Sequence, residues 1–258
     1  MKIKALAQQY WPTVVLFVLL FVAWQLAVSY SGIRAYLLPS PWSVVQAFWE
    51  PDIPWTQHIW TTTLEIVGAF FMAAAVGVML GVAIAWSPLI ANALVPFLVF
   101  LNTLPKVAIA PLLIVWFGFG PTSTIVLVTA STFFPVLVNG LEGFKSTDQD
   151  RIDLLRSMGA TPGQIFRGVV LPSALPFIFS GLQIGLVTCL LSTIVGEFVN
   201  GREGLGARIM QANNVLDIAE VFAVMIILGA MAAIFDFVLR LIRRRFLFWS
   251  PGERRPAR

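Results

Sequence analysis

The sequence has few charges, one cysteine and one histidine. Asp, Glu, Lys and Arg make up only 12% of its 258 residues, about half the share found in soluble domains, which excludes a soluble globular fold. A single cysteine, Cys189, cannot form an intrachain disulfide. A single histidine, His58, excludes a histidine metal cluster and a catalytic relay built on several histidines. We therefore expect no catalytic residues, no metal site and no enzymatic activity in this chain.

Apolar residues, in contrast, are abundant. They make up 58% of the chain, with 21 Phe and 9 Trp, and the mean hydropathy is +0.85, which excludes a disordered chain. One membrane-spanning helix takes about 20 apolar residues, so the length allows several spans with short connections. We expect an all-α, polytopic membrane helical bundle that forms a single transmembrane domain over residues 1–258.

Six apolar runs have the length of transmembrane helices. The first, 11–29, is expected to be an additional helix that is retained, because no small-residue cleavage site follows it. The other five belong to a core over 61–245. One of them, 89–120, is too long for an ordinary span and contains Pro105 and Pro111, so a broken helix is expected there. The remaining spans are expected at 63–86, 122–138, 175–199 and 218–241.

The span expected at 63–86 carries a stripe of small residues. Ala73, Gly77, Gly81 and Ala85 are four positions apart and therefore share one face of the helix. We interpret this face as a packing surface inside the protein, where the backbone of another helix comes close.

The basic residues are unevenly distributed. Most of the 17 Lys and Arg residues lie before the first span, in the 140–174 connection or after the last span. By the positive-inside rule, both termini and this connection are expected to be cytoplasmic. The arginines after the last span are expected to contact anionic lipid headgroups rather than nucleic acid.

The 140–174 connection has a helical pattern. Apolar and charged residues recur at helical intervals up to Gly159, which is suited to a left-handed helix end. Thr161, with Gln164 three positions later, is typical of the start of a second helix, and Pro172 is expected to end it. Two amphipathic helices outside the membrane need a surface to cover their apolar faces. That surface is either the protein's own spans or lipid headgroups, or a soluble partner.

The same stretch resembles the cytoplasmic signature of binding-protein-dependent ABC importer permeases. In that family the signature reads Glu-Ala-Ala, three residues, Gly, nine residues, Ile, one residue, Leu-Pro. Every interval is kept here, with mild substitutions. The matching positions are Asp153, Leu154, Leu155, Gly159, Val169, Leu171 and Pro172.

Three further segments are similar to the nitrate, sulfonate, taurine and bicarbonate branch of this family. They are 38–41, 104–120, and Glu197 followed by Gly204-Leu205-Gly206. The resemblance covers about residues 35 to 250, and it implies the type I ABC importer permease fold in a bacterial inner membrane.

The resemblance also implies a set of partners. Members of the family work as two permease subunits, here a homodimer or a close heterodimer, with a cytoplasmic ABC ATPase dimer and an extracytoplasmic solute-binding protein. ATP and Mg would be bound by the ATPase, since this chain has no Gly-x-x-x-x-Gly-Lys-Ser/Thr phosphate loop and is expected to hold no cofactor. Membrane lipid completes the expected surroundings, and nucleic acid is not expected.

By the same resemblance, the helix that begins at Asp153 and the turn after it would be the coupling helix, seated in a groove of the ATPase. The solute would be a small polar or anionic compound such as a sulfonate, taurine, nitrate or bicarbonate, and the sequence does not choose among them. The expected coupling residues are Asp153, Leu154, Leu155, Arg156, Gly159, Ala160 and Thr161.

Two charged residues within apolar runs are candidates for the translocation pathway. Lys106 lies between the helix-breaking Pro105 and Pro111, where it would attract an anionic solute, extend to the membrane surface or pair with Glu197. Glu197, near the end of the fifth span, is a candidate gate or pathway residue.

Other charges near the spans are expected to be structural. Asp236 and Arg240 are four positions apart with the acid first, which favours an ion pair on the last helix. Glu65 and His58, near one end of the second span, are expected at the membrane interface.

A different class of function is an ATP-independent secondary transporter that uses Lys106 and Glu197 as a proton-coupled pair. It predicts internal symmetry and solute flux without ATP, but the two amphipathic helices have no counterpart in the first half of the sequence. A membrane-embedded enzyme lacks clustered nucleophiles or ligands. A scaffold would leave the broken third span unexplained.

Overall fold

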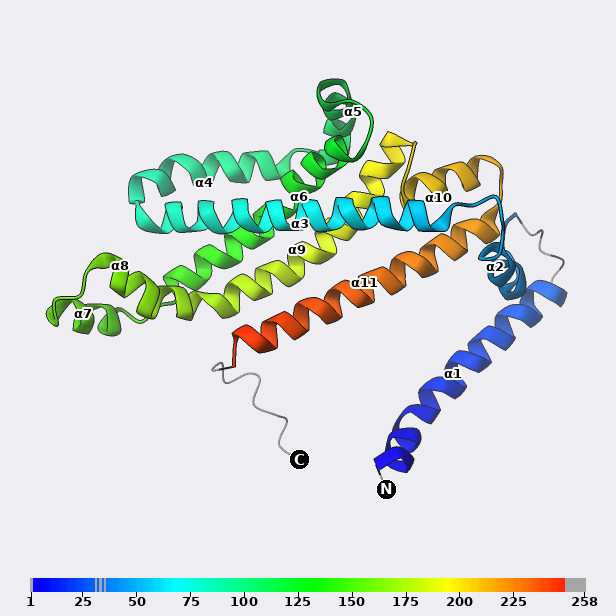
Figure 1. The fold of residues 1–258 in the computed structure, drawn as a ribbon, viewed down its shortest axis with the longest axis horizontal. Coiled ribbons are helices and arrows are strands. Elements are labelled where there is room, and N and C mark those ends of the chain that lie inside the picture. Colours follow the sequence, from blue (N-terminus) through cyan, green and yellow to red (C-terminus); the bar gives the residue numbers. More distant parts are fainter. Residues whose placement is uncertain (1, 31, 33, 35, 249–258) are drawn as a thin grey trace.

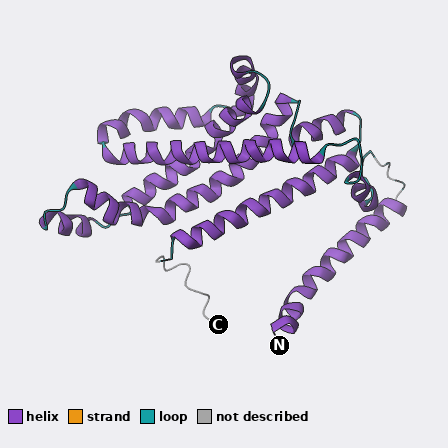
Figure 2. Cartoon of the chain, viewed as in Figure 1, coloured by secondary structure: helices purple, strands orange, loops and turns teal. Residues whose placement is uncertain are grey.

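The computed structural model describes residues 2–30, 32, 34 and 36–248, and every regular element among them is a helix (Figure 2). The long helices form an elongated bundle (Figure 1). Two short helices, α7 (Gln149–Ser157) and α8 (Pro162–Ile165), lie at one end, called the α7 end below. Two others, α2 (Pro41–Ala47) and α10 (Leu205–Asn214), lie at the opposite end, called the α10 end.

Within the part of the chain that the structure describes, four helices are long and apolar enough to cross a membrane, which confirms a multi-spanning bundle. Two further helices, α4 (Pro88–Thr103) and α5 (Lys106–Phe117), count as a fifth span if they are taken together, and they are bent by 94°. The four are α3 (Trp55–Trp86), α6 (Pro121–Lys145), the continuous helix Pro162–Asn200 that ends in α9 (Leu171–Asn200), and α11 (Ile218–Phe246).

The sixth expected span falls on α1 (Lys2–Tyr30), which diverges from the bundle and meets it near α2 (Figure 1). Among the described residues, its apolar stretch Val18–Tyr30 is shorter than a span.

The break in the third span lies at Pro105, as the sequence predicted. Leu104 and Pro105 have extended ψ values of 137° and 98°, and α5 starts directly afterwards. Pro111, which was expected to contribute to the break, lies inside α5 without ending it. A proline inside a helix removes one hydrogen bond, and the short α5 continues past that gap.

The core of the bundle is built around α6, which packs against both α3 and α9. Ala73 and Gly77 of the small-residue stripe are buried, and a Cβ at Gly77 would lie only 2.8 Å from the backbone oxygen of Phe133 in α6. Gly81 is buried as well, so three positions of the stripe form an internal packing surface, as predicted, whereas Ala85 is exposed near the end of α3.

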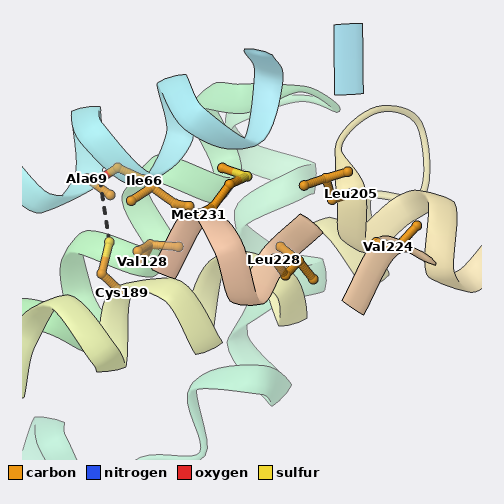
Figure 3. Close-up of a cluster of buried hydrophobic side chains, with 8 residues drawn as sticks. All are labelled: Ile66, Ala69, Val128, Cys189, Leu205, Val224, Leu228 and Met231. Carbon is orange, nitrogen blue, oxygen red and sulfur yellow. Dashed lines mark hydrogen bonds between the residues drawn. The ribbon is translucent and has the colours of Figure 1, made fainter. Parts of the chain in front are cut away.

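A second part of the core joins α10 and α11 to the other spans (Figure 3). Side chains from α3, α6, α9, α10 and α11 meet there, and the Sγ of Cys189 lies 3.5 Å from the backbone oxygen of Ile66 as a weak donor. The cluster consists of Ile66, Ala69, Val128, Cys189, Leu205, Val224, Leu228 and Met231.

The connection between α6 and α9 is shorter than the expected 140–174. Because α6 continues to Lys145 and helix resumes at Pro162, the non-helical part and α7 occupy only 146–161. The prediction that Pro172 ends the second helix is wrong. A π-helical turn, Phe166–Val170, widens the helix, and Pro172 then falls in the first turn of α9.

Candidate functional site

The α7–α8 hairpin, defined here as residues 148–165, projects beyond the long helices at the α7 end (Figure 1). Asp148 caps α7 by accepting a hydrogen bond from the Asp150 N–H at 3.0 Å. Gly159 has a φ of +82°, which confirms the left-handed helix end predicted from the sequence. At the start of α8, Oε1 of Gln164 accepts from the Thr161 N–H at 2.8 Å, as a capping box requires. The starts of both helices of the hairpin are thus fixed by hydrogen bonds.

The apolar face of the hairpin is only partly covered by the chain itself. Ile152 and Ile165 are buried, whereas the side chains of Leu154 and Met158 are 61% and 74% exposed. The chain's own spans therefore account for one part of the face and leave the other part open to a partner.

The charged residues of the hairpin also face outward. Arg156 and Asp153 pair at 3.2 Å with both side chains about two-thirds exposed. Gly159 and Thr161 are exposed as well, while Leu155 and Ala160 are half-buried. The seven predicted coupling residues are thus brought together on one projecting element.

Behind the hairpin lies a hollow of about 370 Å³, between α7, α8 and the ends of α3 and α6. Three aromatic rings meet along its wall. Phe166 contacts Trp86 of α3 and Phe144 of α6, with ring centroids 5.7 Å and 6.0 Å apart. These contacts connect the hairpin to two spans, and sequence reasoning missed them because Trp86 and Phe166 are far apart in the chain.

The broken span presents Lys106 at the start of α5. Its Nζ donates to Oδ1 of Asn102 at 2.8 Å, and within the described part of the chain no ion pair joins it to Glu197. The alternative pairing of these two residues is therefore wrong for this structure. Pro105 and Pro111 are exposed.

A groove of about 120 Å³ lies between α5, α6 and α9, and its lining begins with Val107, the residue after Lys106. Its walls are mostly apolar, with two hydroxyl groups. The lining residues are Val107, Leu127, Ser131, Leu191, Ser192 and Val195.

Glu197 does not line this groove. It is fully buried near the α10 end, where its Oε1 accepts from Oγ1 of Thr62 and its Oε2 accepts from the Gly206 N–H, both at 2.5 Å. Thr62 in turn accepts from the Leu205 N–H at 2.9 Å. The carboxyl group thus holds the start of α10 against α3 and α9, and the gate or pathway role of Glu197 stays a prediction.

Two glycines make this arrangement possible. Gly204 has a φ of +101°, and a Cβ there would overlap the carboxyl group of Glu197. A Cβ at Gly206 would lie 2.7 Å from the backbone oxygen of Ile194. The Gly204 N–H also donates to Nδ1 of His58 at 3.2 Å. We call Glu197 and the hydrogen-bonded residues around its carboxyl group the carboxylate clasp. It consists of His58, Thr62, Glu197, Gly204, Leu205 and Gly206.

Two residues expected at the membrane interface lie inside the protein instead. His58 is buried in the clasp, and Glu65 is fully buried one turn beyond Thr62 on α3. No sequence pattern predicts this burial, because an acidic residue near a helix end is normally exposed.

Two ion pairs stabilise α11. Asp236 and Arg240 form the expected pair on its exposed face. Arg208 of α10 and Glu220 of α11 form a second, largely buried pair, with 2.7 Å between Nε and Oε1, which sequence reasoning did not find. Within the described residues, no group of three His, Cys, Asp or Glu side chains is placed to hold a metal ion.

Comparison with known proteins agrees with the resemblance seen in the sequence. The family described as "Binding-protein-dependent transport system inner membrane component" matches residues 73–247. The chain is 34% identical to the riboflavin transport system permease protein RibX of Chloroflexus aurantiacus, with 96% of this chain and 95% of that protein covered. It is 33% identical to the taurine transport system permease protein TauC of Escherichia coli, over 92% of this chain and 88% of that one.

The fold is similar to a chain of the MetNI methionine ABC transporter in an inward-facing conformation. The TM-score is 0.65 at 23% sequence identity, and the match covers 81% of this chain and 98% of that chain. This likeness confirms the expected type I importer permease fold.

Proposed function

Because the chain belongs to the family of binding-protein-dependent transport system inner membrane components, we propose that it forms the translocation pathway of an ATP-driven importer for a small solute. It is a multi-pass ABC transporter permease. The observation that carries the proposal is the α7–α8 hairpin, a rigid projecting element whose outward face carries the expected coupling residues.

The proposed partners follow from this role. A second permease subunit would complete the pathway, and an external binding protein would deliver the solute. A cytoplasmic ATPase dimer would bind ATP and Mg, and this chain would hold no cofactor. The α7 end would then face the cytoplasm, together with both termini, in a bacterial inner membrane.

The proposed coupling step is mechanical. Closure of the ATPase around nucleotide would move the hairpin through Leu154, Met158 and the Asp153–Arg156 pair. Phe166 would pass this movement to α3 and α6, since its ring lies against Trp86 and Phe144.

The proposed solute is small and polar or anionic, such as a sulfonate, taurine, nitrate or bicarbonate. Similarity to permeases named for riboflavin and taurine supports a small organic compound. Lys106, beside the groove between α5, α6 and α9, supplies a positive charge that suits an anion. The ligand of the external binding protein, measured by calorimetry, identifies the solute.

A matched pair of variants tests the coupling role. Gly159→Val forces a β-branched residue into a positive φ, whereas Gly163→Val lies in the same hairpin at an ordinary φ. In vesicles that contain the permease, ATPase and binding protein, Gly159→Val should insert normally but lose uptake per ATP hydrolysed, and Gly163→Val should keep it. Equal coupling in both variants would show that the hairpin does not transmit the ATPase movement.

The secondary-transporter alternative loses its structural basis. Lys106 bonds to Asn102, and Glu197 bonds to Thr62 and Gly206, so the two charges are not coupled. The same vesicles without the ATPase test this alternative directly, because solute flux at the full rate would support it and overturn the proposed function.

A further inference from the structure

Glu65 is the least satisfied polar side chain in the described part of the bundle. Its side chain is fully buried, and neither Oε1 nor Oε2 has a hydrogen-bond partner among the described residues. An ionised carboxylate in such a place would cost several kcal/mol, because it has lost its water and gained no compensating donor.

The neighbours of Glu65 increase this cost. The polar side chains that face it are Glu197 of α9, Thr124 of α6 and Glu203 of the turn before α10. Two of these three are acids, so they would repel a negative charge on Glu65. Thr124 is itself 2% exposed, and its Oγ1 also lacks a partner among the described residues.

The positive charges nearby are already engaged. Arg208 is paired with Glu220, and Nδ1 of His58 accepts a hydrogen bond from the Gly204 N–H, which favours a neutral ring. Glu203 is exposed and accepts from Gln57 at 3.3 Å. No cation of the described chain is therefore placed to balance two carboxylates.

Glu197 and Glu65 differ in their hydrogen bonds. Both oxygens of Glu197 accept short hydrogen bonds, from Thr62 and Gly206, as an ionised carboxylate does. Glu65 accepts no such hydrogen bond, and Thr124 is the one hydroxyl that faces it, so the site suits a carboxylic acid that carries its own proton better than a carboxylate.

From this geometry we infer that Glu65 and Glu197 form a buried proton-binding site that holds one proton, mainly on Glu65. The proton turns Glu65 into a donor, and the acceptors that face it are Glu197 and Thr124. The carboxylate clasp therefore packs against a neutral acid, and it loses this support when the proton leaves. This inference does not depend on transport or on the proposed function.

The site makes stability depend on pH with a defined sign. A Glu exposed to water in the unfolded chain is ionised at neutral pH, so the folded chain binds one proton more than the unfolded chain. Raising the pH then favours the unfolded chain, by up to about tenfold in the unfolding equilibrium for each pH unit.

The test compares two Glu→Gln variants of the full-length chain in detergent. Gln has the shape of a neutral Glu, so Glu65→Gln should fold at least as well as the unmodified chain. It should also remove a large part of the fall in thermal midpoint between about pH 6 and about pH 9. The control, Glu142→Gln, changes an exposed acid near the C-terminal end of α6 that does not face Glu65, and it should leave that fall unchanged. A Glu65→Gln variant that fails to fold, or that keeps the full pH dependence, overturns the inference.

A spectroscopic measurement covers the unmodified chain. A buried carboxylic acid gives an infrared C=O stretching band above the amide bands, and this band should be present at neutral pH and lost in Glu65→Gln. Its absence from the unmodified chain would show that both acids are ionised. Stability that changes with sodium or divalent cations instead of pH would indicate a metal ion between the carboxylates, and would also overturn the inference.

Discussion

Because Gly204 belongs to the carboxylate clasp, adding one methyl group there should lower the free energy of unfolding far more than at most positions. In Gly204→Ala, the added Cβ would overlap the carboxyl group of Glu197, and the backbone would remain at a φ of +101° and a ψ of 166°. This region is almost restricted to glycine and costs other residues of order 1–3 kcal/mol. Displacing Glu197 would also leave the buried donors of Thr62 and Gly206 without an acceptor, at about 1–3 kcal/mol each.

A second glycine serves as a control, because it isolates the destabilisation that comes from a positive φ alone. Gly201 ends α9 with a φ of +67°, and a Cβ there would meet no atom within 4 Å among the described residues. Gly201→Ala should therefore lose only about 1–2 kcal/mol. Gly204→Ala should lose roughly 3–9 kcal/mol in the free energy of unfolding.

Thermal unfolding in detergent, followed by the fraction of chain that remains monodisperse after heating, ranks the two variants against the unmodified protein. The reasoning is refuted if Gly204→Ala melts no lower than Gly201→Ala, because the clasp would then tolerate displacement of its carboxyl group.

Two further predictions concern packing and charge. Gly77→Val should prevent α3 from packing on α6, since its Cβ would lie 2.8 Å from a backbone oxygen. The control Gly229→Ala in α11 should be nearly neutral, because its Cβ would meet no atom within 4 Å among the described residues. The yield of monodisperse protein measures both variants, and equal yields would contradict the close contact. Arg208→Ala should lower the free energy of unfolding by about 3–5 kcal/mol, because it leaves Glu220 buried without its partner. The double variant Arg208→Met with Glu220→Leu should restore most of the lost thermal midpoint. A double variant as unstable as Arg208→Ala would show that the cost comes from lost packing instead.

Local patterns of the sequence predicted the features that depend on neighbouring residues. Four-residue spacing placed Gly77 on a packing face, and Pro105 marked the break of the third span. Gly159 marked the end of α7, and Thr161 marked the start of α8. In each case a single residue type has a strong conformational or steric preference that neighbouring residues do not override.

Features that depend on distant residues could not be predicted in this way. Glu197 was expected in the pathway because an acid in an apolar run suggests function, yet its partners Thr62 and Gly206 come from two other segments. Glu65 was expected at the membrane interface, and its burial could not be predicted because it depends on how α6 and α9 pack around α3. The continuation of helix through Pro172 depends on a π turn, which apolar periodicity does not reveal.

One unbroken helical rod, Pro162–Asn200, runs the length of the bundle. Its 39 residues span about 58 Å, with the hairpin attached at its start and Glu197 near its far end. A tilt of only about 5° about the start of this helix would shift its far end by about 5 Å. In the importer proposed above, a small movement of the ATPase would therefore be amplified without any intermediate element. The π turn at Phe166–Val170 is the point where such a helix bends most easily. Stiffening this turn would change how far the opposite end of the helix moves when the hairpin moves.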